Sequence, residues 1–220
     1  MSTSSITDAH EAAITELAAA GDWLTAEQRC DVWRQARDAT TNPLDRARAE
    51  AVTPAAVEGR HPATDHLPAA AVEVAHRLAS DPGRLTRAWA DEQIDELGEE
   101  TYTEVVGVTS IAMVIDRLRR ALGLAPVDLP VPRPGEPSRI RPDDVGDIGA
   151  WVSQTTGETR ANVSRTLSLV PVTNATWRQL VDSHYSRGSQ FMSKQWDRAL
   201  SRPQVEMIAS RTTSVNECFY

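Results

Sequence analysis

Two side chains near the carboxyl end of the chain have types and a spacing that suit redox chemistry. Cys218 lies in the final run "SVNECFY", and Glu206 precedes it by twelve residues within a run of helical character. A cysteine thiolate is a strong nucleophile, and a thiol at a helix N-terminus has a lowered pKa because the helix dipole is positive there. Cys218 is therefore the candidate nucleophile of a thiol site, and Glu206 is a charged residue on the helix that precedes it.

Other residues that could do chemistry are few. The 220-residue chain has only two cysteines, Cys30 and Cys218, which is too few for a disulfide framework or a tetrahedral thiolate metal site. Cys30 lies inside a predicted helix, where we expect a buried structural thiol rather than a redox partner. His61, His66 and His76 stand five and ten residues apart, with two prolines between them and no cysteine nearby. We therefore expect no metal and no cofactor.

The charge and hydropathy of the chain argue against two classes of partner. The formal net charge is −8, with 31 acidic and 23 basic residues, whereas binding to a nucleic-acid backbone needs a basic face. No stretch approaches the ~20 apolar residues of a membrane helix, and the start "MSTSSITDAHEAA" lacks the basic and apolar regions of a signal peptide. We therefore expect no nucleic-acid partner, no membrane partner, and a cytoplasmic location in which both thiols stay reduced.

Local patterns predict helices over most of the chain, and hence an all-α fold. Ala, Leu, Arg, Glu and Gln dominate, and runs of β-branched residues are short. Thr7 or Asp8 can cap a first helix that Gly21 would end, and Thr25 with Gln28 forms a capping-box pair for the second. In the longest pattern, at 99–123, apolar residues recur three and four positions apart, at Val105, Val108, Ile111, Ile115, Leu118 and Leu122. Further helical patterns cover 67–83, 84–98, 159–170, 174–188, 189–200 and 201–216.

The distribution of proline divides the chain. Six of the thirteen prolines fall between Pro126 and Pro142, and such a stretch cannot be helical. We therefore predict an amino-terminal helical lobe over 1–123, a proline-rich linker over 124–146, and the start of a second helical lobe over 147–220 that carries the redox residues.

A weak internal repeat links the two predicted lobes. The run "LTAEQ" in the first lobe and the run "LSRPQ" in the second each place a leucine, a hydroxyl N-cap and a glutamine at the start of a helix. When the two runs are aligned, Glu206 corresponds to Cys30 and Cys218 to Asn42, so the amino-terminal copy would be a degenerate repeat that serves as a scaffold. The helix of the second copy is expected to bury a face made of Val205, Ile208, Ala209 and Thr212.

The residues around Cys218 resemble the alkyl hydroperoxidase D-like branch of the carboxymuconolactone decarboxylase superfamily. In that branch a helical glutamate is followed twelve residues later by the first cysteine of a C-x-x-C pair, with a histidine four residues beyond the second cysteine. Glu206, Cys218 and the runs "IAS" and "NECFY" match this pattern. The long helix expected at 99–123 also resembles the helix that follows the cysteine pair. The second cysteine and the histidine would fall beyond residue 220, so half of the motif is present.

The resemblance implies an alkyl hydroperoxidase D-like helical bundle, its second lobe incomplete, that reduces a peroxide. Cys218 would attack the peroxide, and Glu206 would move the proton. The implied partners are a peroxide substrate, an unidentified thiol reductant, and further copies of the chain in a homo-oligomer. A second thiol three residues after Cys218 would resolve the oxidised cysteine as a disulfide.

Several alternatives stay open. The residue after Tyr220 is expected to be a selenocysteine whose codon was translated as a stop, which would leave the 220-residue chain inactive; a nonsense truncation or a fragment is the rival explanation. A carboxymuconolactone decarboxylase-like enzyme would be a different reaction within the superfamily, although that chemistry needs no thiol pair. A non-catalytic helical scaffold is the alternative from another class of protein.

Overall fold

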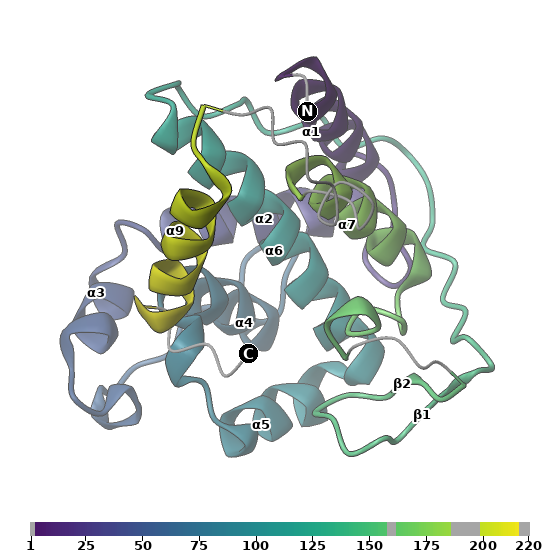
Figure 1. Cartoon of the computed structure of the whole chain (residues 1–220). Coiled ribbons are helices and arrows are strands. Elements are labelled where there is room, and N and C mark those ends of the chain that lie inside the picture. Colours follow the sequence, from purple (N-terminus) through teal and green to yellow (C-terminus); the bar gives the residue numbers. More distant parts are fainter. Residues whose placement is uncertain (1–2, 158–161, 186–198, 216–220) are drawn as a thin grey trace.

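The computed structural model describes residues 3–157, 162–185 and 199–215, and helices dominate them (Figure 1). The predicted all-α class is therefore confirmed. A small antiparallel sheet, in which β1 (Val145–Gly146) pairs with β2 (Gln154–Thr155), is the exception among the described residues. The α-helices in chain order are α1 (Thr3–Leu17), α2 (Ala26–Asp38), α3 (Pro43–Glu50), α4 (Ala69–Ser80), α5 (Arg87–Leu97), α6 (Glu99–Ala121), α7 (Pro171–His184) and α9 (Arg202–Val215).

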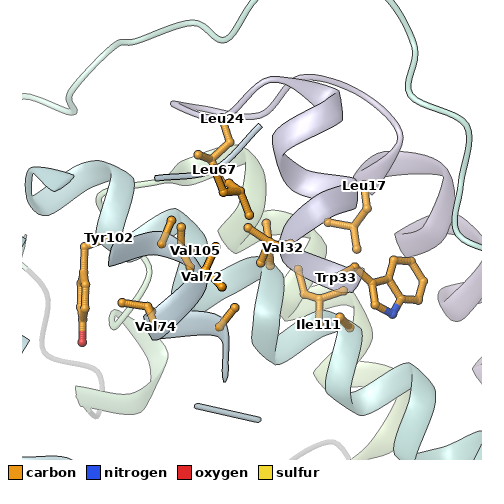
Figure 2. Packing of buried hydrophobic residues seen from close by; sticks show 14 of the residues in the cluster. Leu17, Leu24, Val32, Trp33, Leu67, Val72, Val74, Tyr102, Val105 and Ile111 are labelled. Atoms are coloured by element: carbon orange, nitrogen blue, oxygen red, sulfur yellow. The ribbon is translucent and has the colours of Figure 1, made fainter. Parts of the chain in front are cut away.

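The core forms around α6, which runs for 23 residues. This helix packs against α2, α4, α5 and α7, and α1 packs on α7. Figure 2 shows side chains of α2, α4 and α6 gathered in one apolar cluster. The predicted apolar face of α6 is buried at Val105, Val108, Ile111 and Ile115, whereas Leu122, just past the helix end, is 63% exposed. No helix in the described part of the chain, α6 included, is both long and apolar enough to cross a membrane.

Capping residues set the start of α2 and of α3. Thr25 Oγ1 accepts a hydrogen bond from Gln28 N at 3.3 Å, and Thr25 N donates to Gln28 Oε1 at 2.9 Å, so the predicted capping box is confirmed. The next helix, α3, starts at Pro43 behind Asn42, whose Oδ1 accepts a hydrogen bond from Leu44 N at 2.9 Å. Proline suits this first helical position because its missing N–H would have no partner within the helix.

The limits of α1 differ from the prediction. The helix begins at Thr3, so Thr7 and Asp8 lie inside it. Neither can be its N-cap, because a side chain caps a helix only where the backbone leaves helical geometry. It ends four residues before Gly21, so this glycine does not terminate it. Gly21 instead permits a close approach, since a Cβ at this position would lie 1.8 Å from Glu104 Oε1.

A fully buried ion pair joins the turn after α1 to three helices. Glu104 of α6 accepts hydrogen bonds from Trp23 N at 2.5 Å and Leu24 N at 3.0 Å, and Thr173 Oγ1 of α7 donates to Oε1 at 3.3 Å. The guanidinium of Arg29, on α2, places Nε 3.5 Å from the same Oε1. Burial raises the pKa of Glu104, and Arg29 and the two backbone N–H groups oppose that rise. The turn after α1 and the helices α2 and α7 thus all contact this one carboxylate of α6.

The proline-rich segment 124–146 forms no helix, as predicted, and two of its backbone N–H groups bond to the residues that follow α1. Arg133 N donates to Ala18 O at 2.7 Å, and Arg139 N donates to Asp22 O at 2.8 Å. The carboxylate of Asp22 also accepts from the first backbone N–H groups of α7, which has no capping side chain of its own. The division into two lobes and a linker stays a prediction.

Two predicted helical patterns between the sheet and α9 have different outcomes. In the pattern at 159–170, the described residues form a short 3-10 turn at Asn162–Ser164 and further turns, not an α-helix. Pro171 begins α7 and disfavours helical geometry in the residue before it, which separates the two segments. The pattern at 189–200 lies almost wholly outside the described residues.

Helix α9 confirms the helix predicted at 201–216, but the prediction that one of its faces is buried is wrong. Ile208 is 55% exposed, Ala209 and Thr212 are also exposed, and Val205 is half-buried. None of the residues of α9 is buried against the described part of the chain. The spacing of apolar residues shows which face a helix can bury, but it does not show that a partner covers that face.

A histidine pair between α1 and α7 predicts a pH-dependent stability. His10 Nε2 and His184 Nε2 lie 2.8 Å apart, burial lowers the pKa of both below 6.5, and the charges of His184 and Arg119 lower that of His10 further. The folded chain then binds fewer protons than the unfolded chain, so this contribution is present above about pH 6.5 and is lost as the pH falls. Between about pH 7 and pH 5 we expect the wild type to lose melting temperature relative to His184→Gln. The raised pKa of His61 acts in the opposite direction in both proteins and cancels in this comparison.

The exposed His66 provides the matched control for this pair. His66→Gln should keep the pH dependence of the wild type when melting is followed by circular dichroism. An equal fall in melting temperature for wild type, His184→Gln and His66→Gln would show that the pair does not titrate as described.

Candidate functional site

The residues predicted to form the thiol site lie at the carboxyl end. Cys218 is outside the described residues, so the structure gives no distance between it and Glu206. Glu206 is exposed on α9, with its Oε1 3.8 Å from Arg202 Nε, and an exposed pair of this kind contributes little to stability. Cys30 is a buried thiol, as expected: its Sγ lies 3.4 Å from Pro130 O, and burial raises its pKa and so disfavours the reactive thiolate.

A second group of chemically capable side chains lies in the interior. Asp45, His61, Glu73 and His76, which we call the buried histidine cluster, are all almost completely buried. Asp45 comes from the first turn of α3, His61 from the segment between α3 and α4, and the other two from α4. Because residues three apart face the same side of a helix, α4 presents Glu73 and His76 together.

Both imidazole rings of the cluster converge on one carboxylate oxygen. His76 Nδ1 lies 2.5 Å from Asp45 Oδ2, and His61 Nε2 lies 3.3 Å from the same oxygen. The two rings stack, with 3.8 Å between their centroids. The second nitrogen of each ring faces another oxygen: His61 Nδ1 is 2.7 Å from Glu73 Oε2, and His76 Nε2 is 3.1 Å from Gln35 Oε1.

Further contacts hold the two carboxylates in place. Arg48 Nη1 donates to Glu73 Oε1 at 2.6 Å, and its Nη2 donates to Gly59 O, also at 2.6 Å. Gly59 has a φ of 126°, a left-handed conformation that favours glycine and that positions the turn leading to His61. Ser80 Oγ donates to Asp45 Oδ1 at 3.4 Å. The cluster comes from α3, α4 and the segment at 59–61, and α2 contributes the supporting Gln35.

The cluster balances its charges internally. Burial alone would lower the pKa of His61, but the carboxylates of Asp45 and Glu73 outweigh this effect and raise it to about 9. Burial opposes ionisation of Asp45 and of Glu73, yet His61 and His76 hold the pKa of Asp45 below its usual range, and His61 and Arg48 lower that of Glu73. At neutral pH the cations His61 and Arg48 thus match two buried carboxylates, which buried charges require.

Two cavities are lined in part by residues of the cluster. One of about 540 Å³ is lined by Asp45 and by side chains of α2, α3, α4 and α6, among them Arg117 and Arg120. The other, of about 600 Å³, is lined by Arg48 and Glu73. Asp45 and Glu73 therefore each line a cavity, although these two residues are as buried as the two histidines.

The spacing of these residues along the chain did not predict the cluster. Of the three histidines His61, His66 and His76, the structure brings the first and the third together and leaves His66 exposed. Their common partner is Asp45, which precedes His61 by sixteen residues. A usable signal was present in α4, where Glu73 and His76 interrupt the apolar run "AAAVEVAHRLAS". Polar residues three apart on such a helix indicate a buried polar network, because most of the other residues of the helix are apolar.

Comparisons with known proteins assign no family. No protein-family model, no curated protein and no solved structure matches the chain. A function must therefore be argued from the residues and the geometry of this chain.

Proposed function

We propose that this protein is a thiol-dependent peroxidase of the alkyl hydroperoxidase D-like kind, with Cys218 as the nucleophile. The observation that supports the proposal is a repeat of local structure at the offset between the runs "LTAEQ" and "LSRPQ". The helix α2 begins at Ala26, and α9 begins at Arg202, so the two helix starts are separated by this same offset. Just as a capping box precedes α2, Ser201 N donates to Gln204 Oε1 at 2.8 Å at the start of α9.

The two helices also share the pattern of their apolar faces. Along α2 a buried stripe recurs at the spacing of one helix face. Shifting its positions by the offset of the repeat gives the face that the sequence predicts for α9. Seven residues of α2 are buried. Four of them, Arg29, Val32, Trp33 and Ala36, correspond to Val205, Ile208, Ala209 and Thr212, and the other three are Ala26, Cys30 and Asp31.

The same correspondence gives Cys218 a chemical setting. Its counterpart in the first copy is Asn42, the residue that caps α3. A thiol in such a position would face the first backbone N–H groups of a helix and the positive end of its dipole. Both favour the thiolate, which is the form that reacts with peroxides.

The proposed reaction starts with the Cys218 thiolate. Its sulfur attacks one peroxide oxygen, the O–O bond breaks, and the alkoxide that leaves takes up a proton that Glu206 or water supplies. Cys218 is then a sulfenic acid, and a thiol reductant condenses with it to form a disulfide and release water. A further thiol cleaves that disulfide by exchange and restores the Cys218 thiol. Each turnover thus reduces one peroxide to an alcohol and water and oxidises two thiols.

The main alternative is a non-catalytic helical scaffold, and the first copy of the repeat favours it. Asn42 and the buried Cys30 stand where Cys218 and Glu206 stand in the second copy, so the first copy lacks the proposed nucleophile and proton carrier. A carboxymuconolactone decarboxylase-like reaction remains the further alternative. In each case we propose a homo-oligomer, and the exposed Met207, Ile208 and Val215 of α9 would suit contact with another copy.

The peroxidase proposal predicts that activity depends on one of the two cysteines. The purified protein should consume an alkyl hydroperoxide in the presence of dithiothreitol. Cys218→Ser should fall to the uncatalysed rate, because the only other thiol of the chain, that of Cys30, is buried. The matched control is Cys30→Ser, which removes the buried thiol and should keep the activity.

Two results would overturn the proposal. One is turnover by Cys218→Ser at the rate of the wild type. The other is an absence of turnover in a full-length protein whose circular dichroism shows folded helices, and that result would favour the scaffold.

A further inference from the structure

We propose that Asp45, His61 and His76 form a binding site for a divalent transition-metal ion, with Zn²⁺ the best fit to the donor set. Each side chain offers one ligand atom, and the three atoms lie within 4.8 Å of one another. All three side chains are buried, so the ligands are already gathered in the folded chain. The proposal does not involve Cys218 and does not depend on the peroxidase function.

The distances between the ligand atoms suit a small metal ion. In a tetrahedral site with metal–ligand bonds of about 2.0–2.2 Å, ligand atoms lie about 3.4 Å apart. The separation of His61 Nε2 from Asp45 Oδ2 is already 3.3 Å. His76 Nδ1 is closer to that oxygen, at 2.5 Å, which is a hydrogen-bond distance. A metal that replaced the proton between these two atoms would move them about 1 Å apart and tilt the stacked rings away from each other.

The surroundings of both histidines match those of metal-binding imidazoles. A ligating histidine usually donates its other ring N–H to a carboxylate or another oxygen, which fixes the tautomer that binds the metal. His61 Nδ1 has this partner in Glu73, and His76 Nε2 has it in Gln35. Arg48 in turn holds Glu73 through its other oxygen. The remaining nitrogen of each ring, His61 Nε2 and His76 Nδ1, is therefore oriented toward Asp45.

An unpartnered atom points to a ligand independently of those distances. His61 Nε2 is buried and makes no hydrogen bond within the described part of the chain, although it faces Asp45 Oδ2. The local charge is compatible with a bound cation. A metal ion bound to two neutral rings would take the place of the protonated His61 as the charge that, with Arg48, balances Asp45 and Glu73.

The donor set selects the class of metal. Two imidazole nitrogens and one carboxylate oxygen suit Zn²⁺ and the neighbouring transition metals, whereas Mg²⁺ and Ca²⁺ prefer oxygen ligands alone. Three protein ligands leave a further coordination position for water or another small ligand. Of the three ligands, Asp45 lines the cavity of about 540 Å³.

Metal titration of the purified, tag-free chain tests this proposal. The chelator-treated protein should take up one Zn²⁺ per chain in competition with a chromophoric chelator. Asp45→Asn and His61→Gln should each weaken this affinity by more than about 100-fold, since the loss of even a second-shell partner costs 10–100-fold. Glu73→Gln, which keeps all three direct ligands, should weaken it by about 10–100-fold. His66→Gln, which alters an exposed histidine, is the control and should bind as the wild type does.

A Co²⁺ titration of the wild type keeps the test decisive if the site variants fail to fold. Co²⁺ bound by two histidines and a carboxylate should give visible d–d bands without the near-ultraviolet charge-transfer band of a cobalt thiolate. A thiolate band that disappears in Cys218→Ser would place the metal elsewhere and overturn the proposal. Uptake of less than a tenth of an equivalent of Zn²⁺ by the folded wild type would also overturn it, and the cluster would then be a proton-linked network only.

Discussion

Replacing Glu104 with alanine is expected to lower the free energy of unfolding by about 3–5 kcal/mol, because it removes one partner of a fully buried ion pair. Arg29 would keep its charge in the interior with only the carbonyls of Glu16 and Ala19 as hydrogen-bond acceptors. The N–H groups of Trp23 and Leu24 would also lose their acceptor. Urea denaturation followed by far-ultraviolet circular dichroism measures this change.

Glu104→Gln is the matched control for this variant. The amide keeps the size of the side chain and one oxygen that can accept the two backbone N–H groups, but it gives up the charge that faces Arg29. We therefore expect Glu104→Gln to lower the free energy of unfolding, but by less than Glu104→Ala does. A loss below about 1 kcal/mol for Glu104→Ala would mean that the buried pair does not hold the helices together in the way its contacts suggest.

The second large effect is expected for Trp33→Ala, with a loss of about 3–5 kcal/mol in the same measurement. Trp33 is fully buried on α2, in the cluster that Figure 2 shows, and the cavity left by the ring would not be filled. Its Nε1 also donates to Asp116 Oδ2 at 2.9 Å, and Arg37 lies over the ring, 5.5 Å from its centroid, while pairing with Asp116.

Trp33→Phe separates packing from hydrogen bonding at this position. It keeps most of the apolar volume and removes the indole N–H, so we expect a loss of about 1.5–3 kcal/mol, the usual value for a hydrogen bond to a charged group. The result that would contradict the structure is an equal and small effect of both substitutions.

Local rules predicted the helices well where their signals lie within a few residues. The capping box of Thr25 and Gln28 and the apolar spacing of α6 are of this kind, and both are found in the structure. Gly21 was misjudged because a glycine just beyond a helix usually terminates it. Here its lack of a side chain serves a contact with Glu104, which is more than eighty residues away in the sequence. Such a close approach leaves no local pattern.

The two candidate sites differ in the same way: one was predicted from a short motif, and the other depends on contacts between distant segments. Glu206 and Cys218 were found from a short motif, and their relation in space stays a prediction. The cluster of Asp45, His61 and His76 could not be found from spacing, because its members come from different segments that only the packing of α3 on α4 brings together. Sequence reasoning reaches a site of this kind only through indirect signs, such as polar residues on an apolar helix.

The most direct test of the peroxidase proposal is to trap the sulfenic acid that it requires. The folded protein should be treated with one equivalent of an alkyl hydroperoxide in the presence of dimedone and then mapped by peptide mass spectrometry. We predict a dimedone adduct, or a disulfide derived from the sulfenic acid, on the peptide that contains Cys218, and none on the buried Cys30. Unmodified Cys218, or equal labelling of both cysteines, would contradict the assignment of Cys218 as the nucleophile.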